Sequence, residues 1–290
     1  MRSTPLFVAL LLGLFVSPAF SSETSKAQLT WQGNYRDAVL QARREKKMMF
    51  ILFCAEGDAS QCDCLCKDVL TDAKIIAKLK KFVCLRVPLD ATTSHGKKQK
   101  KLLEHSSLAE MLGRQGMAVI DYAHKDADYY GTVVSCFPIL RNQPYSVKKT
   151  LVILNLPPGT LHQRTLIYAV RIHPECPAST NGRLSPILVE EAQSHSRYQA
   201  RIRLQGHHNW ENRFHRINTR LSNGLIACEV CAESWPGEGL LQGAIECVRC
   251  WRLSSGHWSA VRGYHNCYGY DIERGSNGIW YATGIFGTRH

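Results

Sequence analysis

The sequence predicts an α/β protein made of two domains in series. The first half alternates helical segments with short apolar runs, a pattern typical of a mostly parallel sheet covered by helices. The second half has three amphipathic helical segments followed by two strand-like runs. About 270 residues remain after an N-terminal export signal, which is more than one average domain.

The first 21 residues have the pattern of a secretory signal peptide. Met1-Arg2 precedes the apolar run LFVALLLGLFV, and Ala19 and Ser21 occupy the −3 and −1 positions of a cleavage site. The run is too short to span a bilayer, and no later segment is long and apolar enough to do so. We therefore expect cleavage near Ser21 and a secreted or periplasmic protein. A short membrane anchor that is never cut is the alternative.

Export changes what the twelve cysteines imply, because oxidising compartments favour disulfides over free thiolates. All twelve follow the signal and their number is even, so disulfides are expected, although their connectivity cannot be read from the sequence. The candidates in the C-terminal half are Cys228, Cys231, Cys247, Cys250 and Cys267, with buried thiols as the alternative.

The net charge of +12 favours anionic partners such as lipid headgroups or acidic glycans. The densest lysine runs, AKLKK and GKKQKK, are not interleaved with aromatic residues, so they are interpreted as solvated surface. We expect no nucleic-acid partner. Peripheral contact with a membrane remains open.

Three helices, four strands and one loop are predicted in the N-terminal half. In chain order we expect a helix over 35–46, a buried strand at Met48–Phe53, a helix over 67–80, the strand FVCLRVPLD, a lysine-rich loop, a helix over 102–112, and the strands GMAVIDY and TVVSCFPIL. A cysteine cluster with Cys62, Cys64 and Cys66 follows the first strand.

This order of elements, with the cysteines after the first strand, resembles a thioredoxin-like domain over residues 30–145. In that family a Cys-x-x-Cys-Lys motif opens a helix whose dipole lowers the thiol pKa. Cys66-Lys67 matches the second cysteine and the lysine, whereas Asp63 occupies the place of the first cysteine. Gly116-Met117-Ala118 stands where the family has a cis-proline. The resemblance leaves open thiol–disulfide exchange at Cys62–Cys66 or a non-catalytic, structural role.

Capping signals divide the C-terminal half. Residues 146–159 are predicted to hold a strand at Thr150–Leu156 and a linker. Thr160 and Gln163 form a capping box that opens a helix ending at Pro174, and Ser185-Pro186 open a second helix. A third helix is expected over about 239–253, and two strands at 268–272 and 279–286 close the chain around a glycine-rich turn.

Four ordered motifs lie within residues 160–290. They are Gly206-His207-His208, then Glu229, then Trp251-x-x-Ser-x-Gly-His257, and a closing hairpin with Tyr268-Gly269-Tyr270 and Phe286-Gly287. In this order they resemble a CAP domain of the SCP-like extracellular family, most closely its short bacterial form. The resemblance implies an α-β-α sandwich. Val230 departs from the family, which usually has asparagine after the glutamate.

The resemblance also implies a cleft lined by two histidines and one or two glutamates, which holds a divalent metal in several family members. Carried over by motif, His208 or its neighbour His207, together with Glu229 and His257, form this set, and Glu233 is a candidate fourth member. Imidazole and carboxylate ligands suit Zn²⁺, and three of them leave a position for water. The alternative is that these groups only hydrogen-bond one another.

The pairs Cys228-x-x-Cys231 and Cys247-x-x-Cys250 have the spacing of a four-thiolate zinc ribbon. The second pair lies inside the predicted third helix and not in a knuckle turn, so we expect no ribbon. His195 shares an apolar helix face with two neighbours and is predicted to be packed.

Together these patterns predict an extracytoplasmic binding module for a lipid, an envelope glycan or a protein. The alternatives are a metal-dependent hydrolase at the histidine cleft, a thiol–disulfide oxidoreductase at Cys62–Cys66, and an envelope protein without a small-molecule site.

Overall fold

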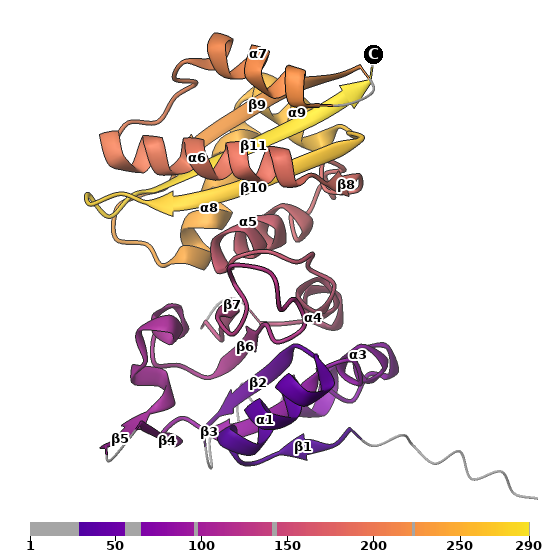
Figure 1. The fold of residues 1–290 in the computed structure, drawn as a ribbon, viewed down its shortest axis with the longest axis vertical. Helices are drawn as coiled ribbons and strands as arrows, with labels where there is room; N and C mark the ends of the chain where they lie inside the picture. Colours follow the sequence, from indigo (N-terminus) through magenta and orange to yellow (C-terminus); the bar gives the residue numbers. More distant parts are fainter. Residues whose placement is uncertain (1–28, 56–64, 96–97, 141–143, 222–223, 290) are drawn as a thin grey trace, which may run out of the picture.

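A computed structural model describes residues 29–55, 65–95, 98–140, 144–221 and 224–289. The predicted signal peptide and two of the candidate redox residues, Cys62 and Cys64, lie outside these residues. The protein is α/β, with one main sheet in each half and helices on both faces of each sheet (Figure 1). Within the described residues, no helix combines the length and the apolar composition needed to cross a bilayer.

The N-terminal half is built around a five-stranded sheet. Its elements are β1 (Trp31–Gln32), α1 (Tyr35–Glu45), β2 (Met49–Cys54), η1 (Leu65–Val69), α3 (Ala73–Leu79), β3 (Val83–Pro88), β4 (Thr92–His95), β5 (Lys98–Lys101), η2 (Leu102–Glu104), η3 (Ser106–Met111), β6 (Gly116–Ile120), β7 (Val133–Pro138) and α4 (Val147–Leu154). The sheet order is β1-β3-β2-β6-β7, in which β1 and β2 run parallel to β3 while β6 and β7 are antiparallel to their neighbours. Helix α1 packs on one face, and η1 and α3 pack on the other.

Two predicted helices of this half are broken in the structure. The segment 67–80 is a short π-helix, η1, followed by α3, because the Asp72 side chain accepts from the backbone N–H groups of Lys74 and Ile75 and starts a new helix. The segment 102–112 is two 3₁₀ turns, η2 and η3, separated by the extended backbone of His105. The lysine-rich loop before them forms the β4–β5 hairpin.

The strand predicted at Thr150–Leu156 is wrong, because this segment belongs to helix α4. Ser146 caps the helix by accepting from the backbone N–H of Lys149. The buried residues Thr150, Ile153 and Leu154 have helical spacing, and a short apolar run of this kind is ambiguous between helix and strand.

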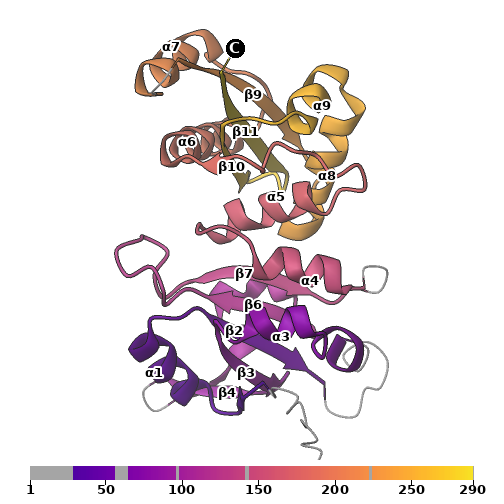
Figure 2. The same cartoon turned by 90° about the vertical axis from the view of Figure 1, so that its right-hand side faces the viewer.

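The C-terminal half is a three-layer α-β-α arrangement. Its elements are α5 (Leu161–Arg171), β8 (Arg183–Leu184), α6 (Pro186–Ile202), α7 (Trp210–Arg220), β9 (Leu225–Glu233), α8 (Leu240–Leu253), α9 (Ser255–Arg262), β10 (Cys267–Arg274) and β11 (Trp280–Arg289). The sheet order is β8-β10-β11-β9, and β11 is antiparallel to both of its neighbours. Helices α6 and α7 cover one face, and α5, α8 and α9 lie on the other (Figure 2).

The predicted helix starts of this half are confirmed. The capping box of Thr160 and Gln163 is complete, and the Ser185 side chain caps α6 with Pro186 in its first turn. Helix α7 was not predicted. Helix α8 ends at Leu253, and the extended Ser254 separates it from α9, so His257 lies in a helix of its own.

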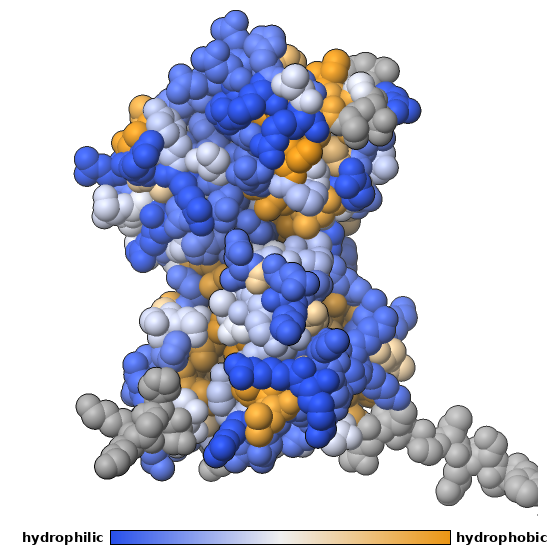
Figure 3. Space-filling model, viewed as in Figure 1, coloured by the Kyte–Doolittle hydropathy of each residue, from blue (hydrophilic) through white to orange (hydrophobic). Residues whose placement is uncertain are grey.

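Helix α5 lies between the two sheets and joins the halves (Figures 1 and 2). Arg164 on α5 is only 1% exposed; its Nε donates to Ser135 Oγ on β7 at 3.0 Å, and its Nη1 donates to the carbonyls of Leu156 and Pro157 at 3.2 and 2.8 Å. Burial lowers the pKa of this guanidinium to about 10. One apolar core continues across the junction, although the outer surface narrows there (Figure 3).

We expect Arg164→Met to lower the free energy of unfolding by roughly 2–4 kcal/mol, because it leaves the Ser135 hydroxyl, the buried Leu156 carbonyl and the partly buried Pro157 carbonyl without their donor. Urea unfolding followed by circular dichroism measures the change. Arg114→Met, at an exposed position, is the control and should change stability by less than about 0.5 kcal/mol. Equal effects of the two substitutions would contradict the bridging role of Arg164.

A buried carboxyl lies between the second sheet and α6. Asp271 on β10 is 1% exposed; its Oδ2 accepts from the Ser196 hydroxyl, and its Oδ1 has no hydrogen-bond partner among the described residues. Burial raises the pKa of Asp271 to about 7, although the Ser196 hydrogen bond opposes this. The folded protein therefore binds this proton more tightly than the unfolded chain does.

Asp271→Asn should remove a pH dependence of stability. Because the pKa of Asp271 is higher in the folded protein than in the unfolded chain, its contribution to the free energy of unfolding is fully present below about pH 4. This contribution is lost as the pH rises through about 7, and the loss reaches up to roughly 4 kcal/mol. The asparagine variant should therefore gain stability relative to wild type between pH 5 and pH 8, as measured by urea unfolding at each pH. A difference that does not vary with pH would contradict the assignment.

Candidate functional site

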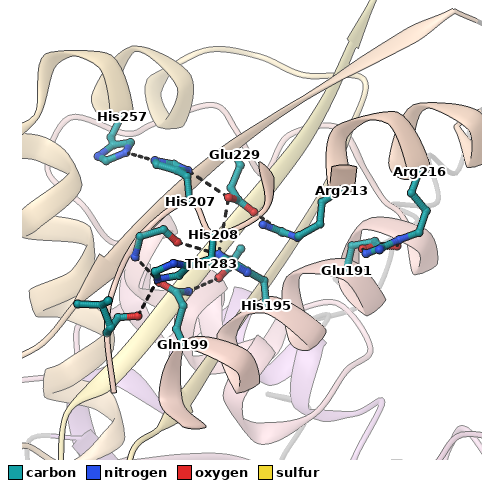
Figure 4. Close-up of polar contacts among 12 residues, drawn as sticks. Glu191, His195, Gln199, His207, His208, Arg213, Arg216, Glu229, His257 and Thr283 are labelled. Atoms are coloured by element: carbon teal, nitrogen blue, oxygen red, sulfur yellow. Dashed lines mark hydrogen bonds and ion pairs between the residues drawn. The ribbon is translucent and has the colours of Figure 1, made fainter. Parts of the chain in front are cut away.

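Glu229 is the centre of a polar network on the face of β9 that α6 and α7 cover. Side chains alternate along a strand, and Cys228 and Val230 pack against the core on the α8 side, so Glu229 faces the opposite layer. Its side chain is 1% exposed. Oε1 accepts from His207 Nδ1 at 3.1 Å, and Oε2 accepts from Arg213 Nη2 on α7 (Figure 4).

The network keeps Glu229 ionised. Burial alone would raise its pKa, but hydrogen bonds from His207 and Arg213 and the positive charge of Arg213 outweigh burial and hold the pKa below its usual value. Glu229 and Arg213 are therefore a buried ion pair, and each compensates the charge of the other.

His207 connects this ion pair to His257. The Glu229 carboxylate can only accept, so Nδ1 of a neutral His207 carries the hydrogen and Nε2 keeps its lone pair. That Nε2 lies 3.1 Å from Nε2 of His257 on α9, which packs against β9. His207 is 41% exposed and His257 is half-buried, so the two nitrogens lie near solvent.

Two predicted members of the site lie elsewhere. His208 turns away from Glu229, its Nε2 bonds to the carbonyl of Leu204 at 3.2 Å, and its ring contacts Tyr198. Glu233 is on the same strand face as Glu229 but four residues further along, about 13 Å away at the rise of a β-strand. Neither side chain can share a ligand with His207 and His257.

The structure adds His195, which is buried as predicted but also borders Glu229. Its Nε2 lies 2.9 Å from the Gly206 carbonyl and 3.8 Å from Glu229 Oε1. One turn along α6, Gln199 accepts from the Gly206 N–H and donates to Thr283 on β11. Helix α6 thus fixes the segment that carries His207. The sequence signal was available, because His195 and Gln199 are polar residues spaced by four on a buried helix face.

Three buried residues could hold a metal ion by their spacing. His195, Glu229 and Cys231 offer ligand atoms that all lie within 4.8 Å of one another. The nitrogen of His195 nearest Glu229 is Nε2, which donates to the Gly206 carbonyl and so carries a hydrogen. Arg213 also engages the carboxylate, and burial raises the pKa of the Cys231 thiol well above its usual value. A metal ion here would have to displace the hydrogen bond from His195 to Gly206, the hydrogen bond from Arg213 to Glu229, and the proton of the Cys231 thiol.

The cysteines differ from the disulfide prediction, because all five candidates of the C-terminal half are free thiols in the structure. Cys228 and Cys231 lie on opposite faces of β9, three residues apart, so they can neither bond to each other nor share a zinc ion with the α8 pair. Cys247 and Cys250 on α8 and Cys267 on β10 each donate to a backbone carbonyl.

Of the candidate redox residues, the structure describes only Cys66. It lies in the π-helix η1, where its partly buried side chain packs against the apolar core.

We expect Glu229→Gln to lower the free energy of unfolding by about 3 kcal/mol or more, because it leaves the Arg213 guanidinium buried without its counter-charge. Urea unfolding measures the loss. Glu190→Gln is the matched control: Glu190 pairs with Arg220 but is 66% exposed, so its loss should cost under about 1 kcal/mol. If Glu229→Gln were as stable as Glu190→Gln, the ion pair between Glu229 and Arg213 would not be needed for the stability of the folded protein.

Comparison with known proteins places the chain in no family. No family model and no curated protein matches it. Among solved structures it is similar to an outer surface protein from Borrelia burgdorferi, at 18% identity over 38% of this chain and 78% of that one, with a TM-score of 0.30. A likeness this weak supports no conclusion about function.

Proposed function

We propose that this chain is an exported protein with a thioredoxin-like domain followed by a CAP-like domain, and that the second domain is a binding module with a divalent metal ion, zinc in the first instance, on His207 and His257. Three observations support the proposal. The N-terminal sheet order β1-β3-β2-β6-β7 fits the first assignment, and the three-layer arrangement fits the second. The geometry of the histidine pair supports the metal.

The distance between the two imidazoles carries the metal proposal. Two nitrogens that share a tetrahedral zinc ion at about 2.0–2.1 Å lie about 3.3 Å apart. The Nε2 atoms of His207 and His257 are 3.1 Å apart, so a metal ion can replace the hydrogen between them with little movement. Glu229 then acts through His207, because a carboxylate on the other ring nitrogen orients a ligating imidazole and makes it more basic.

This arrangement favours binding over hydrolysis. A metal-dependent hydrolase needs a carboxylate free to take a proton from the attacking water. Glu229 is engaged by Arg213 and His207, and Glu233 is too far along β9 to replace it. Two protein ligands leave positions on the metal for oxygen atoms of a bound molecule, which a lipid headgroup, an envelope glycan or a protein can supply.

Zn²⁺ should stabilise the folded protein by mass action, by about 2.7 kcal/mol at a hundredfold excess over its dissociation constant. His257→Ala should abolish this gain and leave the metal-free stability almost unchanged, since the ring is half-buried and its hydrogen bond within the described residues is the one with His207. Thermal unfolding with and without Zn²⁺ measures the metal-free stability and the gain, and isothermal titration calorimetry with Zn²⁺ measures binding.

Two histidine controls make the test specific. His208→Ala and His215→Ala should keep the zinc response, because the first side chain faces Leu204 and the second is exposed on α7. An equal zinc response in wild type and His257→Ala would refute the assignment of the metal to this pair.

A further inference from the structure

One end of the C-terminal half presents exposed apolar side chains next to cations. At the end of α6 the chain reads Arg201-Ile202-Arg203-Leu204, and all four residues are exposed. Ile202 is 36% exposed and Leu204 is 58% exposed. On the connection between β9 and α8, Trp235 is 63% exposed. Apolar and cationic side chains thus alternate at the end of α6, and a tryptophan is exposed nearby.

The segments that carry these residues meet at the same end of the second sheet. The turn between β10 and β11 lies against the end of α6, where Gly275 packs on the carbonyl of Ala200. The same turn contacts the β9–α8 connection, because the Gly237 N–H donates to the Gly278 carbonyl at 3.1 Å. Figure 1 shows the three segments together on the left of the upper half, and Figure 3 shows hydrophobic atoms beside strongly hydrophilic ones on that side. We call residues 201–204, Trp235 and Arg274 the sheet-end surface.

The sheet-end surface has a net positive charge. Arg201, Arg203 and Arg274 are exposed, and the salt bridges that the described residues of this half form involve other arginines. The first and the last lie over aromatic rings, which leaves their charge uncompensated. Glu233, at the end of β9, is an exposed acid beside this surface, and Glu273 is already engaged by a histidine and another arginine.

We propose that the sheet-end surface docks this protein on a lipid bilayer that contains anionic lipids. Ile202, Leu204 and Trp235 enter the boundary between headgroups and acyl chains, where burial of apolar side chains is favourable and tryptophan is enriched. The arginines lie at the level of the phosphates, and each adds to the attraction toward a negative surface. This contact does not depend on the proposed metal.

Charge and shape favour a bilayer over a second copy of the chain. A symmetric contact between two copies would place the same arginines opposite one another, which is unfavourable. The apolar side chains come from two separate segments, and each is a third or more exposed, so they protrude and do not form a groove for a partner segment. A bilayer can contact both segments at once.

Vesicle co-sedimentation tests the proposal with the chain from Ser22 to His290, because the apolar run before it would itself bind lipid. EDTA is present throughout, so no metal joins the protein to a headgroup and the result is independent of the zinc proposal. The protein should bind vesicles of phosphatidylcholine mixed with phosphatidylglycerol and stay in solution with phosphatidylcholine alone. Salt at about 1 M, where the screening length falls to about 3 Å, should weaken the binding.

Apolar variants locate the contact. Leu204→Ser and Trp235→Ser should each weaken binding to the anionic vesicles roughly tenfold. Leu40→Ser is the matched control, because Leu40 is 56% exposed on α1 in the other half, and it should leave binding unchanged. All three positions are exposed, so thermal unfolding should match that of wild type.

Charge variants test the role of the arginines. Arg201→Gln combined with Arg203→Gln should weaken binding to the anionic vesicles roughly tenfold or more. Lys100→Gln combined with Lys101→Gln removes the same charge from exposed positions of the other half, and should weaken binding by less than about twofold because those charges lie beyond the screening length.

Five results would overturn the proposal. They are no binding to the anionic vesicles, equal binding to both kinds of vesicle, wild-type binding by both Leu204→Ser and Trp235→Ser, and equal effects of the arginine and lysine double variants, which would assign the attraction to net charge alone. The fifth is self-association without vesicle binding that Leu204→Ser abolishes, which would assign the surface to a second copy of the chain.

Discussion

The buried ion pair between Glu229 and Arg213 is the interaction on which the C-terminal site depends. Neither charge can remain at its depth alone, so the contact fixes α7 against β9. The second oxygen of the same carboxylate holds His207 by Nδ1 and leaves Nε2 directed at His257. The Glu229 carboxylate thus pairs with Arg213 through one oxygen and orients the His207 imidazole through the other.

The segment that carries His207 is held from a second side by α6. His195 bonds to the Gly206 carbonyl, and Gln199 accepts from the Gly206 N–H. The backbone hydrogen-bonding groups of Gly206 are therefore paired with side chains and not with a helix or strand. Because His257 comes from α9 on the far side of β9, the histidine pair needs α6, β9 and α9 to be packed together. The pair is therefore a product of the folded domain and not of any local motif.

Two buried polar side chains, Arg164 and Asp271, differ in how completely they are paired. In the junction, Arg164 satisfies a hydroxyl and two carbonyls and so stabilises the contact between α5 and β7. In the sheet, one carboxylate oxygen of Asp271 has no hydrogen-bond partner among the described residues, and burial raises the pKa of this group to about 7. Most of the described cysteines are buried, and burial raises the pKa of the thiols of Cys231 and Cys247 well above the usual value, which makes them poor ligands and nucleophiles.

Periodicity and capping were enough to predict the α/β class, most strands and the starts of α5 and α6, because both are local properties of the chain. The resemblance to a CAP domain added the expectation that His208 or His207 lies near Glu229 and His257. Periodicity failed for α4, whose short apolar run fits either a helix or a strand until packing decides. Only the tertiary structure could choose His207 over His208, remove Glu233 and add His195 and Arg213. Those choices depend on which face of a strand or loop each side chain occupies, and on what lies opposite it. Spacing along the chain does not contain that information.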